Sequence, residues 1–527
     1  MQPDKTNFKP VCASLRELAG ADYVEAVCQA RAAVSGEDLG ALRQLAAERV
    51  DFFPEAFQAR LLELLPQTGQ SVCPPLAASA AGATTGPFAA ATQVIRAPLT
   101  GLGYYRVGED GRLYLISKSE HYHVPLGHSF PGYRLLDHAR RLGLPNATHN
   151  NTRGHLTRLL EQELIRTANG LPAGDPAAVR QVVASTEPHV LNRVLNLQTG
   201  SLAAEAALKM ILARFYRAGA AAPAPPDAGR TPVLVVVGDE DGELEGNYHG
   251  TTLLTQTLRG MWPELLAKLE QQGLLLVRAV RPNSLEDVQA VFDRYDTGQH
   301  KVAGFFHEIV MMNYGARLLT KEFLARVYAL CHQRDVPTVV DEIQSCAWYP
   351  QVYQFREYGL QPDFVAVGKG LPGGEYAASK VLFTAAYDNL PQFGALVTNG
   401  QEELASLAYL ITLRWVEANA AATRAVGEYY EHRLRDLAAR HADILEAVEG
   451  SRHLCALRFH DLTAAKCFAS TLNARGLDLS VQTYKPTCPP AALTKLPLIA
   501  GDEVVELVVG RMEEALWGRG AAASASV

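Results

Sequence analysis

The sequence predicts an α/β protein whose large domain is built on a mostly parallel sheet. Two short apolar runs, residues 337–340 (PTVV) and 364–367 (FVAV), lack polar alternation and therefore suit strands covered on both faces. From about Arg153 onward, strand-like runs alternate with segments of helical periodicity, as in a doubly wound domain. A chain of 527 residues is too long for one core, so we expect at least two domains.

Composition and charge exclude several classes of protein. The net charge is −7 without a long basic run, which argues against nucleic acid as a partner. The apolar runs are too short to span a bilayer, and the first ten residues lack the apolar core of a signal peptide. The eight cysteines are scattered without a C-x-x-C pair. We therefore expect a cytoplasmic protein with reduced thiols, no metal site and no membrane association.

The ends of the two apolar runs carry the first candidate site. Residues 337–340 lead into Asp341, and residues 364–367 lead into Gly368 and Lys369. In an open α/β sheet, ligands bind in the crevice at the carboxyl ends of the strands, so a carboxylate and an amine should meet there. Pyridoxal phosphate needs a lysine amine for its imine and a carboxylate that keeps its pyridine nitrogen protonated. This pair therefore predicts a pyridoxal phosphate site.

Three motifs around these residues extend the interpretation. They are D-E-I-Q at 341–344, P-D-F-V at 362–365 and G-K-G-L-P-G-G at 368–374. In this order and spacing they resemble the core of the class III (fold-type I) aminotransferases. The resemblance implies a fold-type I α/β architecture, Lys369 as the catalytic, imine-forming lysine and Asp341 as the partner of the pyridinium. It also implies that Gln344 hydrogen-bonds the phenolic oxygen of the cofactor.

Further matches supply the other cofactor contacts. Gly200 and Ser201 resemble the family's phosphate turn, although a simple helix cap would explain these two residues equally well. The Tyr248-His249-Gly250 turn resembles the one whose aromatic ring stacks on the pyridine. Thr398 aligns with a threonine that reaches the phosphate of the neighbouring subunit, which implies a homodimer with active sites at its interface.

The resemblance also divides the chain. Residues 1–100 lie before it and read as helices followed by a linker, either a cap packed on the body or a module that docks a partner. The other divisions are 101–152 as the first part of a small α+β domain, 153–392 as the large cofactor-binding domain, 393–520 as the rest of the small domain, and 521–527 as a disordered tail.

Departures from the family pattern concern the substrate. Glu308 aligns with the first of two family glutamates, but Asn313 stands at the second, and Leu493 stands where the family has its carboxylate-binding arginine. The loop after Gln344 has no arginine either. We therefore expect a pocket that is not built for the usual glutamate/2-oxoglutarate half-reaction through that arginine. Substrate candidates, each also explicable as a packing or surface residue, are Lys118, His121, Tyr122, His123, Glu308, Lys485 and Lys495.

The function expected is transfer of an amino group between an amine or unusual amino acid and a 2-oxo acid or aldehyde. A racemase, decarboxylase or aminomutase on the same fold is the alternative, and a non-catalytic scaffold anchored by the N-terminal helices is a third. Residues 368–373 also spell G-x-G-x-x-G. The segment that follows reads as a strand and lacks the helix N-terminus that a dinucleotide needs, so we exclude a Rossmann dehydrogenase.

Overall fold

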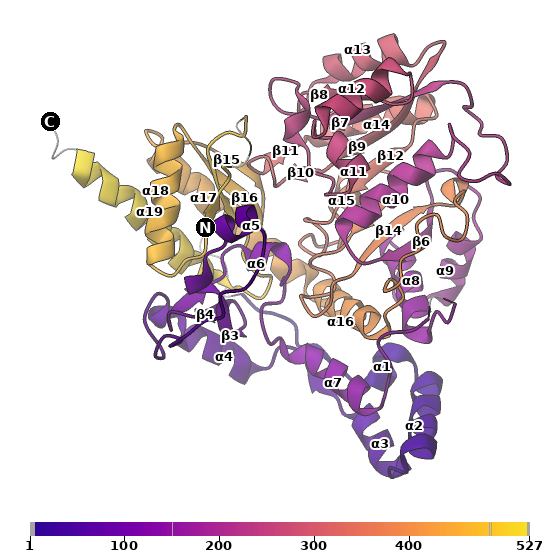
Figure 1. Ribbon diagram of the computed structural model, residues 1–527. Helices are drawn as coiled ribbons and strands as arrows, with labels where there is room; N and C mark the ends of the chain where they lie inside the picture. Colours follow the sequence, from indigo (N-terminus) through magenta and orange to yellow (C-terminus); the bar gives the residue numbers. More distant parts are fainter. Residues whose placement is uncertain (1–5, 150, 484, 486, 524–527) are drawn as a thin grey trace.

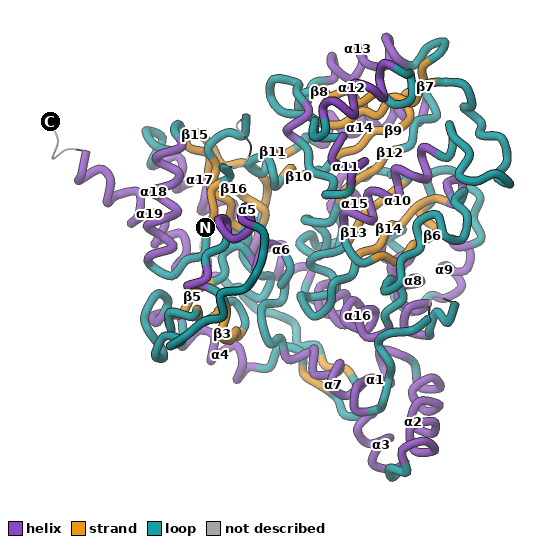
Figure 2. The backbone as a smooth tube through the Cα atoms, in the orientation of Figure 1, coloured by secondary structure: helices purple, strands orange, loops and turns teal. Residues whose placement is uncertain are grey.

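The computed structural model describes residues 6–149, 151–483, 485 and 487–523, and it forms two lobes with helices appended at the N-terminus (Figure 1). The larger lobe surrounds a seven-stranded sheet and the smaller one a four-stranded sheet (Figure 2). Within the described part of the chain, none of the helices combines the length and apolar character needed to cross a membrane.

The large sheet has the order β6-β14-β13-β12-β9-β7-β8. The five strands from β13 to β8 run parallel, and β14 is antiparallel to both of its neighbours. The strands are β6 (Leu191–Leu197), β7 (Thr231–Val237), β8 (Leu276–Val280), β9 (His300–His307), β12 (Thr338–Asp341), β13 (Phe364–Val367) and β14 (Ser379–Thr384). The mostly parallel α/β sheet predicted from the apolar runs is confirmed.

Alternate residues of each strand enter two separate cores. In β7, Val235 and Val237 pack on one side of the sheet, whereas Leu234 and Val236 pack on the other. Because side chains of a strand alternate between its faces, a continuous apolar run fills both cores at once. The helices of this lobe are α8 (His155–Ala168), α9 (Pro176–Val183), α10 (Gly200–Leu212), α11 (Leu253–Thr257), α12 (Pro263–Gln271), α13 (Leu285–Tyr295), α14 (Lys321–Gln333) and α15 (Gln354–Tyr358).

The small lobe is assembled from both ends of the chain. Its C-terminal sheet has the order β15-β16-β18-β17, and a three-stranded sheet β3-β4-β5 comes from the N-terminal side. Leu115 bridges Leu477, and the guanidinium of Arg106 pairs with Asp478 at 3.0 Å. The elements are β3 (Pro98–Leu102), β4 (Tyr105–Gly108), β5 (Leu113–Leu115), β15 (Leu445–Ser451), β16 (Leu454–Phe459), β17 (Ser480–Val481), β18 (Ala491–Thr494), α17 (Ala420–Arg440), α18 (Leu462–Ala474) and α19 (Asp502–Ala523).

The N-terminal extension is helical, as expected from its composition. Helix α1 contacts α7 and α16, and in Figure 1 the group α1–α3 lies at the edge of the large lobe, whereas α4 lies beside the small lobe. Residues 521–523 belong to α19 where we expected disorder, and residues 524–527 lie outside the described chain. The helices of the extension are α1 (Leu15–Ala19), α2 (Ala21–Ser35), α3 (Leu39–Ala47), α4 (Glu55–Glu63) and α5 (Gly86–Ala91). The remaining helices of the body are α6 (Ser119–Tyr122), α7 (Arg134–Arg141) and α16 (Glu403–Ala418).

Candidate active site

A cavity of about 620 Å³ opens at the carboxyl edge of the parallel strands. Asp341 ends β12 and Lys369 follows β13 by two residues, and both line this cavity. The two strands are in parallel register, with Asp341 opposite Ala366, so their carboxyl ends reach the same rim. The structure thus brings together the carboxylate and amine that the sequence analysis paired.

Asp341 is held from two sides. Its Oδ2 lies 3.1 Å from Nδ1 of His249, and its Oδ1 accepts a hydrogen bond from the backbone N–H of Ile343 at 3.0 Å. Both side chains are buried, and Nε2 of His249 has no hydrogen-bond partner among the described residues. His249, predicted as part of the ring-stacking turn, is therefore also a partner of Asp341.

Lys369 occupies a desolvated position. Its φ is 38°, in the left-handed region that non-glycine residues rarely adopt. Burial lowers the pKa of the amine to about 8, against the opposing effect of the Glu308 and Asp341 carboxyls. A lowered pKa increases the fraction of neutral amine near pH 7, which is the nucleophilic and basic form. Such strain and pKa shift together are typical of functional positions.

A buried polar group lies next to Asp341. Nε2 of Gln344 donates to Oε1 of Glu308 at 2.9 Å, while Oε2 of Glu308 and Oε1 of Gln344 are buried without a partner among the described residues. Burial raises the pKa of Glu308 and lowers that of Lys485. Nζ of Lys485 donates to the carbonyl oxygens of Gly246 and Asn247, at 3.1 and 3.0 Å.

The start of α10 forms a compact anion cradle. Thr199 caps this 13-residue helix, and the N–H groups of Gly200 and Ser201 lie at its positive end. A Cβ at Gly200 would meet the Ile343 side chain at 2.9 Å, and one at Gly250, whose φ is +125°, would meet Ser201 at 2.7 Å. Neither glycine can therefore carry a side chain unless its neighbours move. Thr199 does cap the helix, and a phosphate-binding role for Gly200 and Ser201 stays a prediction.

Tyr248 lines the cavity, and its ring makes a cation–π contact with Arg259. The guanidinium carbon of Arg259 lies 4.7 Å from the ring centroid of Tyr248. The sequence analysis missed Arg259, because it follows the Tyr-His-Gly turn by nine residues and belongs to none of the motifs. Only the location of its guanidinium at the cavity identifies it.

The other substrate candidates separate into two groups. His121 and His123 line the cavity from a turn in which Ser119 to Tyr122 all have positive φ, and burial together with Lys369 lowers the pKa of His121 to about 3. The ring of Tyr122 lies 5.2 Å from Nζ of Lys369. Lys118 instead donates to Oγ of Ser480 at 2.9 Å and is absent from the described cavity lining.

Two further predicted residues lie off the cavity. Thr398 is exposed on the surface of the single chain and does not line the cavity within the described residues. Lys495 is fully buried, donates to the backbone carbonyl of Gln344, and has its Nζ 3.6 Å from the Trp348 ring centroid and 4.3 Å from that of Tyr122. Burial, with the charge of Lys369, lowers the pKa of Lys495 well below its usual value.

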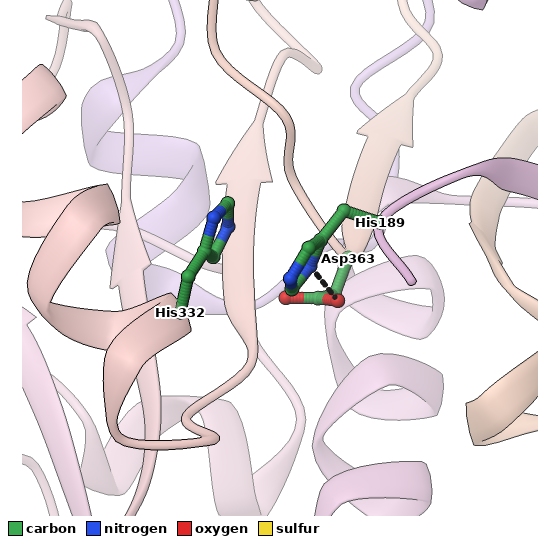
Figure 3. A group of neighbouring side chains, drawn as sticks. All are labelled: His189, His332 and Asp363. Carbon is green, nitrogen blue, oxygen red and sulfur yellow. Dashed lines mark hydrogen bonds and ion pairs between the residues drawn. The ribbon is translucent and has the colours of Figure 1, made fainter. Parts of the chain in front are cut away.

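Figure 3 shows a second cluster of titratable groups. It lies at the amino ends of the parallel strands, since Asp363 directly precedes β13. His189, His332 and Asp363 place three potential metal-ligand atoms within 4.8 Å of one another, although we expected no metal site. The two imidazole rings are stacked, with centroids 3.6 Å apart and planes inclined by 13°. Their lone pairs therefore lie in nearly parallel planes and cannot converge on one ion unless a ring rotates.

Comparison with known proteins identifies the family of this chain. The family model described as aminotransferase class-III matches residues 97–516. The chain is 26% identical over 298 residues to L-lysine-epsilon aminotransferase of Streptomyces clavuligerus, covering 51% of this chain and 61% of the relative. It is 25% identical over 195 residues to acetylornithine aminotransferase of Aquifex aeolicus, covering 37% and 50%. The chain therefore spans only about half to three fifths of the length of these curated relatives.

Solved structures agree on the fold. The ornithine aminotransferase of Toxoplasma gondii superposes with a TM-score of 0.64 at 19% identity, covering 88% of this chain and 96% of that one. The adenosylmethionine-8-amino-7-oxononanoate aminotransferase of Methanocaldococcus jannaschii gives a TM-score of 0.64 at 18% identity, covering 87% and 99%. At these identities the likeness establishes the fold, and it confirms the fold-type I architecture.

Proposed function

Because this chain belongs to the class-III aminotransferase family, we propose that it is a pyridoxal-phosphate-dependent aminotransferase acting between an amine or unusual amino acid and a 2-oxo acid or aldehyde. The observation that carries the proposal is the convergence of Lys369, Asp341 and the Gly200–Ser201 cradle on one cavity. Relatives named for transamination favour this reaction over a racemase, decarboxylase or aminomutase. The retained lysine and carboxylate argue against a purely scaffolding role.

Class-III aminotransferases use pyridoxal phosphate, and the cavity residues fit this group. Buried unpartnered atoms of His249, Gln344 and Glu308 surround the space beside Asp341, where a polar ring would supply partners. Gly200 and Ser201 would hold the phosphate, Asp341 the pyridine nitrogen and Gln344 the phenolic oxygen. Tyr248 would cover one face of the ring. When bound, the cofactor supplies an electron sink for the bonding electrons released at the substrate carbon.

Three groups of the chain would have separate roles in the reaction. His249 orients the Asp341 carboxylate, and the Ile343 N–H fixes its second oxygen. Lys369 Nζ, which is desolvated, would hold and move the proton that leaves the amine-bearing carbon of the substrate. Burial of Asp341 and Gln344 keeps water away from these charges and strengthens their interactions.

The proposal is tested with purified protein loaded with pyridoxal phosphate. We expect visible absorbance of the lysine-bound cofactor, and an oxo product formed from an amine donor in proportion to the amino acid formed from the acceptor. Lys369→Ala should lose both, and Lys118→Ala, which alters a lysine outside the cavity, should keep both. Racemised substrate or released CO₂ without an oxo product would favour the alternative reactions.

We also propose that the enzyme works as a cytosolic homodimer. Exposed Thr398 would contact the cofactor phosphate of the neighbouring subunit, and all eight cysteines are free. Mixed dimers of Lys369→Ala and Thr398→Ala subunits would contain one site with both defects and one with neither. Partial recovery of activity on mixing is expected, and its absence at confirmed subunit exchange would contradict the shared site.

We retain the proposed boundaries at residues 100, 152, 392 and 520. Contacts of α1 with α7 and α16 favour a structural cap for residues 1–100 over a docking module.

A further inference from the structure

Arg259 is a cation that faces the cavity without an acidic partner. No carboxylate oxygen of the described residues lies within 4.0 Å of its guanidinium, and its Nε is buried without a hydrogen-bond partner. Within the described chain, its Nη2 donates to the sulfur of Met261 at 2.9 Å, and thioether sulfur is a weak acceptor. The Tyr248 ring supports the guanidinium from 4.7 Å.

The other charged groups at this cavity already have partners. Asp341 is bound by His249, one oxygen of Glu308 by Gln344, and Lys485 by two backbone carbonyls. Lys369 is assigned to the cofactor. Burial also raises the pKa of Glu308, which favours its neutral form, so this carboxyl does not offset the charge of Arg259. The guanidinium of Arg259, which lines the cavity, therefore has no opposite charge bound to it among the described residues.

The positions of the family's carboxylate-binding pair are apolar or neutral here. Leu493 lies buried within β18, and Asn313 lines the cavity in place of a glutamate. A substrate carboxylate would find no guanidinium at the usual position. Arginine suits this role because its planar donors match a carboxylate in a bidentate arrangement.

We propose that Arg259 is the specificity-determining residue that binds a carboxylate of the substrate, so that this enzyme acts on amino acids and oxo acids rather than on simple amines. This inference rests on the proposed aminotransferase function. The Tyr248 ring limits the orientations of the guanidinium, which reduces the entropy lost when the carboxylate binds.

An oxyanion at Arg259 could belong either to the substrate carboxylate or to the cofactor phosphate. These sources are distinguished by measuring two equilibria on the holoenzyme: retention of pyridoxal phosphate, and binding of glutarate, a dicarboxylate without an amine, by titration calorimetry. The variants are Arg259→Gln, Arg259→Lys and the control Arg281→Gln, whose side chain pairs with Asp287 outside the cavity lining.

We expect Arg259→Gln to weaken glutarate binding by about 10- to 100-fold, as for loss of a charge-assisted hydrogen-bonded pair, with cofactor retention unchanged. Arg259→Lys should recover part of the affinity, and Arg281→Gln should match the wild type. In parallel half-reactions, KM for a carboxylate-bearing donor should rise in Arg259→Gln. A primary amine without a carboxylate should react more slowly with the wild type, and the substitution should leave that slow rate unchanged.

Loss of cofactor from Arg259→Gln with unchanged glutarate affinity would assign Arg259 to the phosphate and overturn the proposal. Equal effects on both donor types, or no glutarate binding by the wild type, would overturn it as well. Failure of the proposed function gives a different result: no lysine-bound cofactor and no half-reaction with any donor, whatever the glutarate affinity.

Discussion

A carboxylate–histidine pair lies at each end of the parallel strands, which we call the carboxyl edge and the amino edge of the sheet. The two pairs have different roles. At the carboxyl edge, Asp341 lies 3.1 Å from Nδ1 of His249, and at the amino edge Asp363 lies 2.9 Å from Nδ1 of His189. Strand β12 connects the edges, because it begins at Thr338, which Asp363 binds, and ends at Asp341.

The two pairs differ in what surrounds their carboxylates. The second oxygen of Asp363 accepts from the N–H and hydroxyl of Thr338, at 2.9 and 3.3 Å, so this carboxylate joins the starts of β12 and β13. Asp341 faces a cavity that also contains Lys369 and unpartnered atoms of Gln344 and His249. A carboxylate–histidine pair is therefore structural where its acceptors are satisfied and functional where a reactive amine and open space adjoin it.

Removing the Lys369 amine at the carboxyl edge should have the largest effect on activity. Lys369→Ala is expected to lower the single-turnover rate at least about 10⁴-fold, because both the covalent anchor and the proton-transferring group disappear. Rapid-mixing absorbance with a reactive donor measures this rate. Retention of more than a hundredth of the wild-type rate would contradict the role of Lys369.

Neutralising the Asp341 carboxylate should have the second largest effect on activity. Asp341→Asn keeps the size of the side chain but removes its charge, and kcat is expected to fall by about 10²–10³-fold, as when a preorganised electrostatic contact is lost. Steady-state kinetics at saturating cofactor measure the change, with circular dichroism as the control for folding. An unchanged kcat would show that Asp341 resembles Asp363 in its role.

The same substitution at the opposite edge should affect stability instead. Asp363→Asn is expected to lower the free energy of unfolding by about 1–3 kcal/mol, since Thr338 and His189 lose a charged partner in a buried position. Urea unfolding followed by fluorescence measures this value. Activity per folded molecule should match the wild type, and a tenfold fall in kcat would remove the distinction between the edges.

The smallest effect concerns pH. The hydrogen bond to Asp363 raises the pKa of His189 above its ordinary value of 6.5. His189 therefore contributes stability that is fully present below pH 6.5 and is lost as pH rises through the raised pKa of the folded state. For this partly exposed pair we expect less than about 1 kcal/mol. Thermal melts between pH 5 and 9 should lose this dependence in His189→Asn, and an identical pH profile in both proteins would contradict it.

Much of the fold and part of the site were predictable because they depend on local sequence. Val-rich runs predicted the strands, and the D-E-I-Q and G-K-G motifs located Asp341 and Lys369 at strand ends. Boundaries are harder to predict. The mostly apolar segment 302–310 continues beyond β9, which spans His300–His307, and Glu308 follows the strand as a cavity residue. Apolar composition continues past the point where hydrogen bonding to neighbouring strands ends, so sequence alone does not mark that point.

The sequence by itself determined the α/β class, the family and the pairing of Asp341 with Lys369, since parallel strands bring their carboxyl ends to one rim. Only the tertiary structure decided that His249 binds Asp341, that Lys118 turns to Ser480, and that Arg259 faces the cavity. These outcomes depend on packing between segments far apart in the chain, and side-chain direction there has no periodic signal. Lys118 and Ser480, separated by 362 positions, are an example.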